Sequence, residues 1–377
     1  MGNDVFGLIY TGESSMQLRD LTYSRSVAAV PFAGRYRCID FIMSNLVNTG
    51  ISNVGIIAQK NYHSLMDHLG SGKEWELHRK RDGLFILPPF VTRDNTGIYR
   101  GTIDAYHSVM GYIRRSSQKY IIISGSHTVF NTTFHDMIAQ HIRTGADITF
   151  MYNEVGIHHP DDQFNELRFN LAEDGRVTGI QLNPNQPATP HSSCDVVMME
   201  KTTFEYLIED AYSRGDTDFL RDVLLRKVGE LKMYGWRYDG YVGCISSLPG
   251  YFNHNINVLR SEVRRDLFNP EHPIYTKVKD EVPARYKGDS KARNCLVADG
   301  CVIEGEVENC VLFRGVHIGK GTKISNCVVL QACDIQEDCE LSYVILDKGC
   351  TVRQGRRLAG YDLSLIHISE PTRLDVI

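Results

Sequence analysis

The stretch "NCLVADGCVIEGEVENCVLFRGVHIGKGTKISNCVVLQACDI", Asn294–Ile335, decides the architecture of the last third of the chain. Four similar segments start there at steps of 15, 17 and 16 residues, namely NCLV at Asn294, NCVL at Asn309, NCVV at Asn326 and SYVI at Ser342. A second set ends at steps of 15, 17 and 17 residues, at Ile303, Ile318, Ile335 and Val352. Two interleaved repeats of nearly equal period predict a solenoid with one coil per repeat.

The spacing inside each repeat indicates which solenoid this is. Aliphatic residues recur every six positions, as at Leu312, Ile318 and Ile324, with a small residue between them. We therefore expect a left-handed parallel β-helix of hexapeptides over residues 291–362. Because each coil buries its aliphatic side chains only against the next coil, we expect this β-helix to have a structural role. Seven of the ten cysteines lie in this block, without any CxxC pair, so we read them as buried free thiols rather than metal ligands.

The first two-thirds of the chain alternates strand-like and helix-like segments. Strands are expected at Val5–Tyr10, Val54–Gln59, Tyr120–Ser124 and Asp147–Val155. Helices are expected at Ile39–Gly50 and Thr102–Arg115. This rhythm predicts an α/β, Rossmann-like domain with a mostly parallel sheet over residues 1–247, followed by a helix and Pro-rich connector over 248–290.

Composition excludes several classes of protein. The chain has 377 residues, 42% of them apolar, and 41 basic against 46 acidic residues, a formal charge of -5. We expect no nucleic-acid surface as its main function, and we read the basic cluster His78–Arg81 as a solvated loop. The absence of an apolar run long enough for a membrane span, of a signal peptide and of a myristoylation motif predicts a cytoplasmic protein without a membrane partner.

The end of the sequence departs from both patterns. "LSLIHISEPTR", Leu363–Arg373, interrupts the hexapeptide repeat and resembles the translation of a transposon-end sequencing adapter. We therefore expect residues 363–377 to be non-native and the β-helix to be cut short. Resequencing across this junction tests the expectation, and finding these codons in the genome would contradict it.

Two motifs carry a resemblance to a known family. "AAVPFAGRYRCIDFIMSNLVNTGI" (residues 28–51) and "YRGTIDA" (residues 99–105), followed by a hexapeptide β-helix, resemble the ADP-glucose pyrophosphorylase (glucose-1-phosphate adenylyltransferase) family to about Asp362. The resemblance implies a nucleotidyltransferase domain that forms ADP-glucose and pyrophosphate from ATP and glucose 1-phosphate in glycogen synthesis. That chemistry requires a Gly-rich phosphate loop, cationic side chains and Mg²⁺ held by carboxylates.

The family's functional positions are degenerate in this chain. The phosphate loop GGxGxRL falls on "GESSMQL", where Gly12 is kept but Glu13, Ser15 and Gln17 replace two glycines and the arginine. Other family positions fall as follows: a phosphate-binding lysine on Val27, the metal aspartate of "GD" on Ser126, the "EKP" lysine on Asn183, and the "DVGT" aspartate on Tyr241.

These replacements remove both metal carboxylates and three cations. A hydroxyl and a phenol are poor ligands for Mg²⁺, so we expect little or no catalysis by this chain alone and no cofactor of its own, the Mg²⁺ being used by a catalytic partner. The pattern resembles the GlgD-type regulatory subunits of that family. The resemblance implies a hetero-tetramer with a catalytic glucose-1-phosphate adenylyltransferase subunit.

Six further positions have two interpretations each. Tyr99, Gly101, Thr102 and Asp104 either keep the fold or retain sugar-nucleotide binding. Arg35 and Arg37 lie where the family places basic residues near its activator site, so they either bind a phosphorylated-sugar effector or form a solvated or interface pair.

Three alternative functions stay open. An active sugar-1-phosphate nucleotidyltransferase would need new carboxylates near Ser126, for which Asp104 is the nearby candidate, and Mg²⁺-dependent nucleotide binding would reveal it. A hexapeptide acyltransferase would need a histidine base, and residues 291–362 contain only His317. A pure assembly scaffold would bind the catalytic subunit without changing its kinetics.

Overall fold

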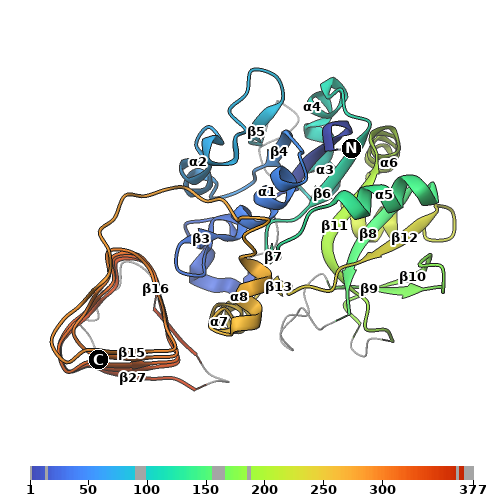
Figure 1. Cartoon of the computed structure of the whole chain (residues 1–377). Coiled ribbons are helices and arrows are strands. Elements are labelled where there is room, and N and C mark those ends of the chain that lie inside the picture. Colours follow the sequence, from blue (N-terminus) through green and yellow to red (C-terminus); the bar gives the residue numbers. More distant parts are fainter. Residues whose placement is uncertain are drawn as a thin grey trace.

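The computed structural model describes residues 2–12, 16–89, 99–154, 166–184, 188–361 and 365–368. Figure 1 shows an α/β domain and, at lower left, a β-helix of triangular cross-section, joined by an extended connector. The expected fold class is confirmed: an α/β domain precedes stacked parallel strands in three sheets, consistent with a left-handed β-helix.

Four parallel strands form the centre of the first domain. They are β1 (Val5–Tyr10), β4 (Asn53–Ile57), β5 (Gly83–Leu87) and β6 (Tyr120–Ser124), in the order β6-β1-β4-β5. All six residues of β1 are buried, as expected of a strand covered on both faces. Because β1 pairs with β4 on one side and β6 on the other, the strand order reverses there, and ligands bind outside the carboxyl ends of strands at such points.

The remaining strands of this sheet are mostly antiparallel. β11 (Ser192–Glu200) pairs antiparallel with β6, with β9 (Leu167–Leu171) and with β8 (Ile148–Asn153). β12 (Met233–Arg237) pairs parallel with β8, and β10 (Val177–Leu182) pairs antiparallel with β9. The register of β11 shifts between Ser193 and Val197, where Asp195 has φ 59°, which is the signature of a β-bulge that re-aims side chains.

Helices cover both faces of the sheet. Phe6 and Leu8 of β1 pack with α3 (Thr102–Ser108), α4 (Met110–Arg115) and α6 (Lys201–Arg214), whereas Val5 and Ile9 pack with α1 (Cys38–Asn48), α2 (His63–Leu69) and α5 (His135–Thr144). Short elements complete the domain: β2 (Pro31–Phe32), β3 (Tyr36–Arg37), β7 (Thr128–Val129), β13 (Gly243–Cys244) and the short helical segments η1 (Gly2–Asp4), η2 (Met16–Thr22), η3 (Val27–Ala29), η4 (Lys73–Trp75) and η5 (Phe219–Leu224).

The prediction of a single helix over Thr102–Arg115 is wrong. The chain forms two helices, α3 and α4, because Val109 leaves helical geometry at φ -101° and ψ 9°. The break places α3 and α4 as separate short helices beside β1 and α6.

A buried histidine makes the stability of this domain depend on pH. Nδ1 of His141 on α5 lies 2.8 Å from the Thr149 hydroxyl, and burial lowers the pKa of His141 to about 4 from its ordinary 6.5. Between those pH values the unfolded chain binds a proton that the folded chain does not. The contribution of neutral His141 to the free energy of unfolding is therefore fully present above pH 6.5. The free energy of unfolding should fall by about 1–3 kcal/mol as the pH drops toward 4.

Chemical denaturation across this pH range measures the effect. His141→Gln should flatten the fall, and the exposed His135→Gln should leave it unchanged. An identical slope in all three proteins would contradict the assignment.

Helices α7 (Leu248–Asn257) and α8 (Ser261–Leu267) and an extended connector lead into the β-helix. Its three sheets each hold five parallel strands. The strands of the first sheet are β14 (Arg285–Tyr286), β17 (Val302–Ile303), β20 (His317–Ile318), β23 (Asp334–Ile335) and β26 (Thr351–Val352). Those of the second are β15 (Lys291–Arg293), β18 (Glu306–Glu308), β21 (Lys323–Ser325), β24 (Glu340–Ser342) and β27 (Arg357–Ala359). Those of the third are β16 (Leu296–Val297), β19 (Val311–Leu312), β22 (Val328–Val329), β25 (Val344–Leu346) and β28 (Ile366–Ile368).

The pairing corrects one register of the repeat. Val311 pairs with Val328 and Val328 with Ile345, so the repeat that begins at Asn326 begins again at Tyr343, not at Ser342. Asn294, Asn309, Asn326 and Tyr343 all have φ between 49° and 53°. Asparagine tolerates this left-handed geometry, which explains its recurrence at this corner of the coils. The side-chain amide of Asn294 also donates to Asn309 Oδ1 at 2.8 Å.

The cysteines of the β-helix are free, and all are buried except the half-buried Cys295. Residues 366–368 lie in the tail that we expect to be non-native. They form β28, which pairs in parallel with β25. Any apolar segment of this length could pair in this way, so the non-native origin of the tail stays a prediction. Among the described residues no helix is both long and apolar enough to cross a membrane.

The two domains share a core. Phe313, Leu330 and Ile345 of the β-helix are buried in one cluster with Leu248 and Phe252 of α7. Beside them Arg25 Nη2 donates to both carboxylate oxygens of Asp347 at 2.9 Å, and each side chain is only 2% exposed. The β-helix is therefore fixed to the first domain by apolar packing and by a buried ion pair.

Candidate functional site

A cavity of 280 Å³ lies where β1 and β6 end. Its lining comes from the ends of these strands and from the loops and helices around them. The lining includes Tyr10, Gly12, Gln59, Tyr99, Arg100, Gly101, Thr102, Tyr106, Ser124, His127, Thr128, Ser193, Asp195, Asp218 and Phe219. The cavity therefore occupies the position predicted for the site, at the reversal of strand order.

The start of α3 closes one side of the cavity by docking on residues 217–219. The Ile103 amide donates to the Thr217 carbonyl at 3.0 Å, and the Phe219 amide donates to the Thr102 hydroxyl at 2.8 Å. A Cβ atom at Gly101 would lie 2.3 Å from the Thr217 carbonyl oxygen. Gly101 is therefore required by close backbone packing.

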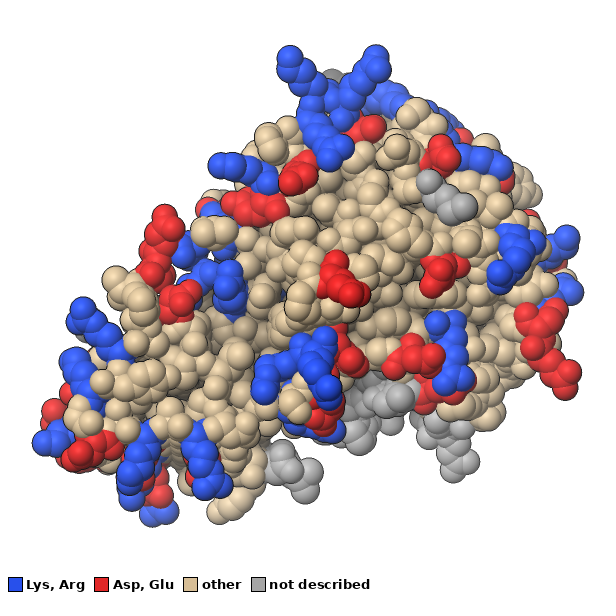
Figure 2. All heavy atoms as spheres, in the orientation of Figure 1, with Lys and Arg blue, Asp and Glu red and all other residues tan. Residues whose placement is uncertain are grey.

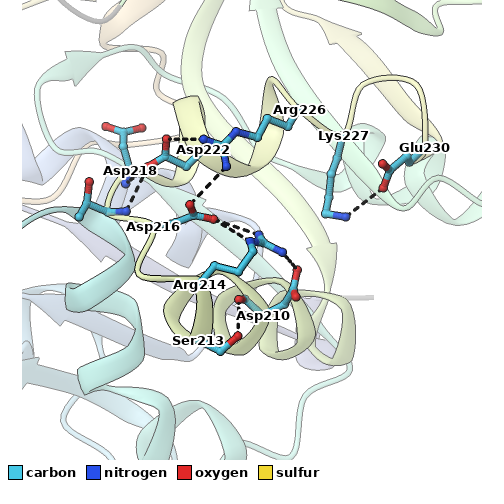
Figure 3. Close-up of polar contacts among 10 residues, drawn as sticks. Asp210, Ser213, Arg214, Asp216, Asp218, Asp222, Arg226, Lys227 and Glu230 are labelled. Atoms are coloured by element: carbon cyan, nitrogen blue, oxygen red, sulfur yellow. Dashed lines mark hydrogen bonds and ion pairs between the residues drawn. The ribbon is translucent and has the colours of Figure 1, made fainter.

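An ion-pair network holds the docked segment in place (Figure 3). Asp222 accepts from the amides of Thr217 at 3.0 Å and Asp218 at 2.9 Å. Arg226 bridges Asp222 and Asp216, and Asp216 also pairs with Arg214 of α6. The adjoining turn η5 is a single π-helical turn, a conformation often found at functional sites.

Gly101→Ala is expected to lower the free energy of unfolding by about 1–3 kcal/mol, because the added methyl group must displace the Thr217 backbone. Thermal or urea unfolding measures the loss. Gly111→Ala is the matched control: a Cβ there meets nothing within 4 Å, and it lies in α4, so alanine should be neutral or stabilising by about 0.5–1 kcal/mol. Equal effects of the two substitutions would rule out the packing argument.

The charged groups in this cavity are mostly negative, and Arg100 and His127 each lie beside an aspartate. Arg100 donates to Asp104 at 2.7 and 2.8 Å, which lowers the pKa of the Asp104 carboxyl. His127 Nδ1 lies 3.6 Å from Asp195 Oδ2. Asp218 accepts from the Arg221 amide at 2.8 Å and so caps η5. Among the described residues no group of three or more His, Cys, Asp or Glu could hold a metal ion.

The structure separates the predicted site residues. Of the degenerate positions, Gly12 lines the cavity, while Gln17 is exposed on η2 and Val27 is buried in the apolar inter-domain cluster. Asn183 is exposed, with φ 49°, and accepts from the Glu166 amide at 2.7 Å, a turn contact. Glu13 and Ser15 lie outside the described residues.

Ser126 and Tyr241 come from neighbouring segments but do not line the cavity. β7 and β13 pair antiparallel, and the Ile245 amide donates to the His127 carbonyl at 2.8 Å. Ser126 is fully buried. The Tyr241 hydroxyl lies 2.7 Å from His254 Nδ1, and burial raises the pKa of Tyr241 to about 12, so the phenol stays neutral. Neither side chain offers an anionic ligand, so these two described positions do not fit Mg²⁺.

The retained family residues have structural partners. The Tyr99 hydroxyl accepts from Ser108 at 2.9 Å, and Asp104 is held by Arg100 and is not part of the cavity lining. Tyr99, Gly101 and Thr102 do line it, so both interpretations of these three remain compatible with their positions.

Sequence reasoning missed Gln59, His127 and Asp195. Gln59 Oε1 lies 3.5 Å from the Tyr10 hydroxyl, and Asp195 reaches the cavity through the bulge in β11. The available signal for Asp195 was an aspartate directly before the apolar run of residues 196–199.

A second hollow, the inter-domain cleft, has a volume of 200 Å³ between the first domain and the β-helix. Its basic residues are Arg35, Arg37, Lys277, Lys279 and Arg314, and its acidic residues are Asp67 and Glu281. The structure therefore brings the predicted pair Arg35 and Arg37 together with cations that sequence reasoning missed, because these come from the connector and the β-helix.

Burial lowers the pKa of two of these cations, Arg37 and Arg314. Burial lowers the pKa of Arg37, which donates to the Ser64 carbonyl at 2.7 Å, and burial followed by repulsion from Arg35 lowers the pKa of Arg314. Within the described part of the chain, the buried Nε of Arg314 has no hydrogen-bond partner. Closely spaced cations with an unpaired donor favour an anionic ligand.

On the face that Figure 2 displays, Lys and Arg gather at the top of the view, whereas over the β-helix they are interspersed with Asp and Glu. The second sheet accounts for part of this pattern, because Lys291, Glu306, Lys323, Glu340 and Arg357 stack in register.

Comparison with known proteins places the fold in a family. Residues 6–240 match the nucleotidyl transferase family, and residues 281–365 match the GlmU-like C-terminal hexapeptide family. The chain is 40% identical to the glycogen biosynthesis protein GlgD of Bacillus subtilis, over 95% of this chain and 93% of that protein. It is 38% identical to GlgD of Geobacillus stearothermophilus, over 86% and 84%.

Catalytic relatives are more distant. The chain is 31% identical to the glucose-1-phosphate adenylyltransferase of Thermotoga neapolitana, over 86% of this chain and 77% of that protein. With this coverage and with both domains matched, the chain belongs to the nucleotidyl transferase family that includes the GlgD proteins and the glucose-1-phosphate adenylyltransferases.

Proposed function

We propose that this chain acts in glycogen biosynthesis as a non-catalytic, regulatory subunit of glucose-1-phosphate adenylyltransferase, the enzyme that converts ATP and glucose 1-phosphate to ADP-glucose and pyrophosphate. The names of its relatives support the role in glycogen biosynthesis. The observation that carries the non-catalytic part is the state of the two metal positions. Ser126 is buried, and Tyr241 is a neutral phenol held at His254.

The chemistry that these positions would have to perform explains the expectation. Nucleotidyl transfer spreads negative charge over phosphate oxygens, and a metal ion contributes several kcal/mol of charge stabilisation at the transition state. The described cavity supplies one arginine, Arg100, which Asp104 already holds. We therefore expect the Mg²⁺ to be bound by a catalytic partner subunit, in a cytoplasmic hetero-tetramer.

Regulation would enter through the inter-domain cleft. Arg35 and Arg314 face the cleft from the two domains, so an anion bound between them contacts both. We propose a phosphorylated sugar as this effector. Allosteric coupling of roughly 1–3 kcal/mol would then reach the partner through the subunit interface.

The test is ADP-glucose formation by the catalytic subunit, alone and co-purified with this chain, over a range of phosphorylated-sugar concentrations. The proposal predicts a higher turnover or a shifted activator response in the complex. Arg314→Met should remove the shift, and the exposed Arg143→Gln, on α5, should keep it. Assembly without any change in kinetics would leave a scaffold role instead.

A further inference from the structure

We infer that the 280 Å³ cavity at the ends of β1 and β6 binds a single uncharged hexose, not a sugar phosphate or a nucleotide. This inference rests on the proposed function in one respect, namely that the cavity no longer performs phosphate chemistry. It goes beyond it by giving the cavity a ligand class of its own.

The charge of the lining argues against phosphate. The described residues contribute one arginine and two aspartates, Asp195 and Asp218, a net formal charge of -1 with His127 neutral. The one arginine is already paired with Asp104 at 2.7 Å. A dianionic sugar phosphate would lose its hydration shell there without gaining a free cation, which is unfavourable.

The chemistry of the lining suits a small neutral polyol. Gln59, Ser193, Thr128 and Asp195 supply amide, hydroxyl and carboxylate groups that can pair with sugar hydroxyls. Tyr10, Tyr99, Tyr106 and Phe219 supply aromatic surface for the apolar face of a sugar ring. The volume lies just below the ~300–1,000 Å³ of pockets for drug-sized ligands, so one small ligand fits better than a nucleotide together with a sugar phosphate.

Asp195 is the residue that decides between the two ligand classes. The bulge in β11 places it at the cavity with its carboxylate 39% exposed and 3.6 Å from His127. A carboxylate can accept from two neighbouring hydroxyls of a sugar, and the same charge repels phosphate. Asp195 has φ 59°, a conformation that asparagine also adopts readily, so Asp195→Asn removes the charge while keeping the backbone.

The experiment is isothermal titration calorimetry on the full chain alone, with D-glucose, glucose 1-phosphate and adenosine as the three probes. The wild-type chain should bind glucose and bind glucose 1-phosphate more weakly. Asp195→Asn should weaken the binding of glucose roughly tenfold and strengthen the binding of glucose 1-phosphate. The two affinities should therefore change in opposite directions. Glu173→Gln, which makes the same charge change at an exposed turn outside the cavity, should change neither.

Three results would overturn the inference: no binding of glucose, tighter binding of glucose 1-phosphate than of glucose by the wild-type chain, or binding of adenosine alone. The assay needs neither the catalytic partner nor turnover. Its failure therefore leaves the proposed regulatory function standing, and failure of that function in the kinetic assay leaves the binding result unaffected.

Discussion

Arg25→Met is expected to lower the free energy of unfolding by about 3–5 kcal/mol, because it leaves a buried carboxylate without its partner. Arg25 and Asp347 are each 2% exposed and lie far apart in sequence, in the first domain and the β-helix. Besides Arg25, the neighbouring Lys348 amide donates to the Asp347 carboxylate at 2.7 Å. Once the arginine is gone, the carboxylate stays in an apolar environment that disfavours its charge.

Urea unfolding measures the effect, and two further variants sharpen it. Arg114→Met breaks an exposed pair with Glu209, whose side chains are 56% and 42% exposed, and should cost less than about 1 kcal/mol. The double variant Arg25→Met/Asp347→Leu should be more stable than Arg25→Met, because it removes the uncompensated charge. A double variant at least as unstable as the single one would show that the carboxylate is not the source of the loss.

Phe313→Ala is the second substitution with a large expected effect, about 3–5 kcal/mol of stability. Phe313 is 2% exposed in the cluster that joins the β-helix to α7, and it also lines the inter-domain cleft. Removing the ring leaves a cavity between the two domains, so we expect a weaker effector response of the assembled complex as well as lower stability.

Differential scanning calorimetry detects the loss of stability, and activator titration detects the loss of response. The control is Tyr23→Ala, an aromatic residue 84% exposed, which should stay within about 0.5 kcal/mol of the wild type. Separate unfolding of the two domains in the wild-type protein would contradict the shared core on which this prediction depends.

The sequence predicted the fold well where a repeat or an apolar run determines it. The parallel coils follow from the period of Asn294, Asn309 and Asn326, and β1 and β6 follow from short buried runs. The error at Ser342 arose because Tyr343 takes the corner conformation that asparagine marks in the other coils, and tyrosine gives no such signal. The break at Val109 is likewise unmarked, because the nearby Gly111 lies inside α4 and not at the break.

The cavity lining includes Gly12, Tyr99 and Thr102 from the family motifs, but not Ser126 or Tyr241. Motif alignment located the strand ends around the cavity, yet it could not show that Val27 is buried in an apolar cluster or that Tyr241 turns to His254. The inter-domain cleft depends on tertiary packing that brings Arg314 beside Arg35. Contacts between residues so far apart in the chain leave no local pattern.

The most direct test of the central claim is ADP-glucose formation by the purified chain alone, with MgATP and glucose 1-phosphate, in a single-turnover format that detects even slow chemistry. With Ser126 buried and Tyr241 neutral, we predict no product above the uncatalysed background and no Mg²⁺-dependent binding of ATP. Turnover near that of the catalytic relatives, with Mg²⁺-dependent ATP binding, would mean that the chain holds a metal with other ligands and would contradict the account.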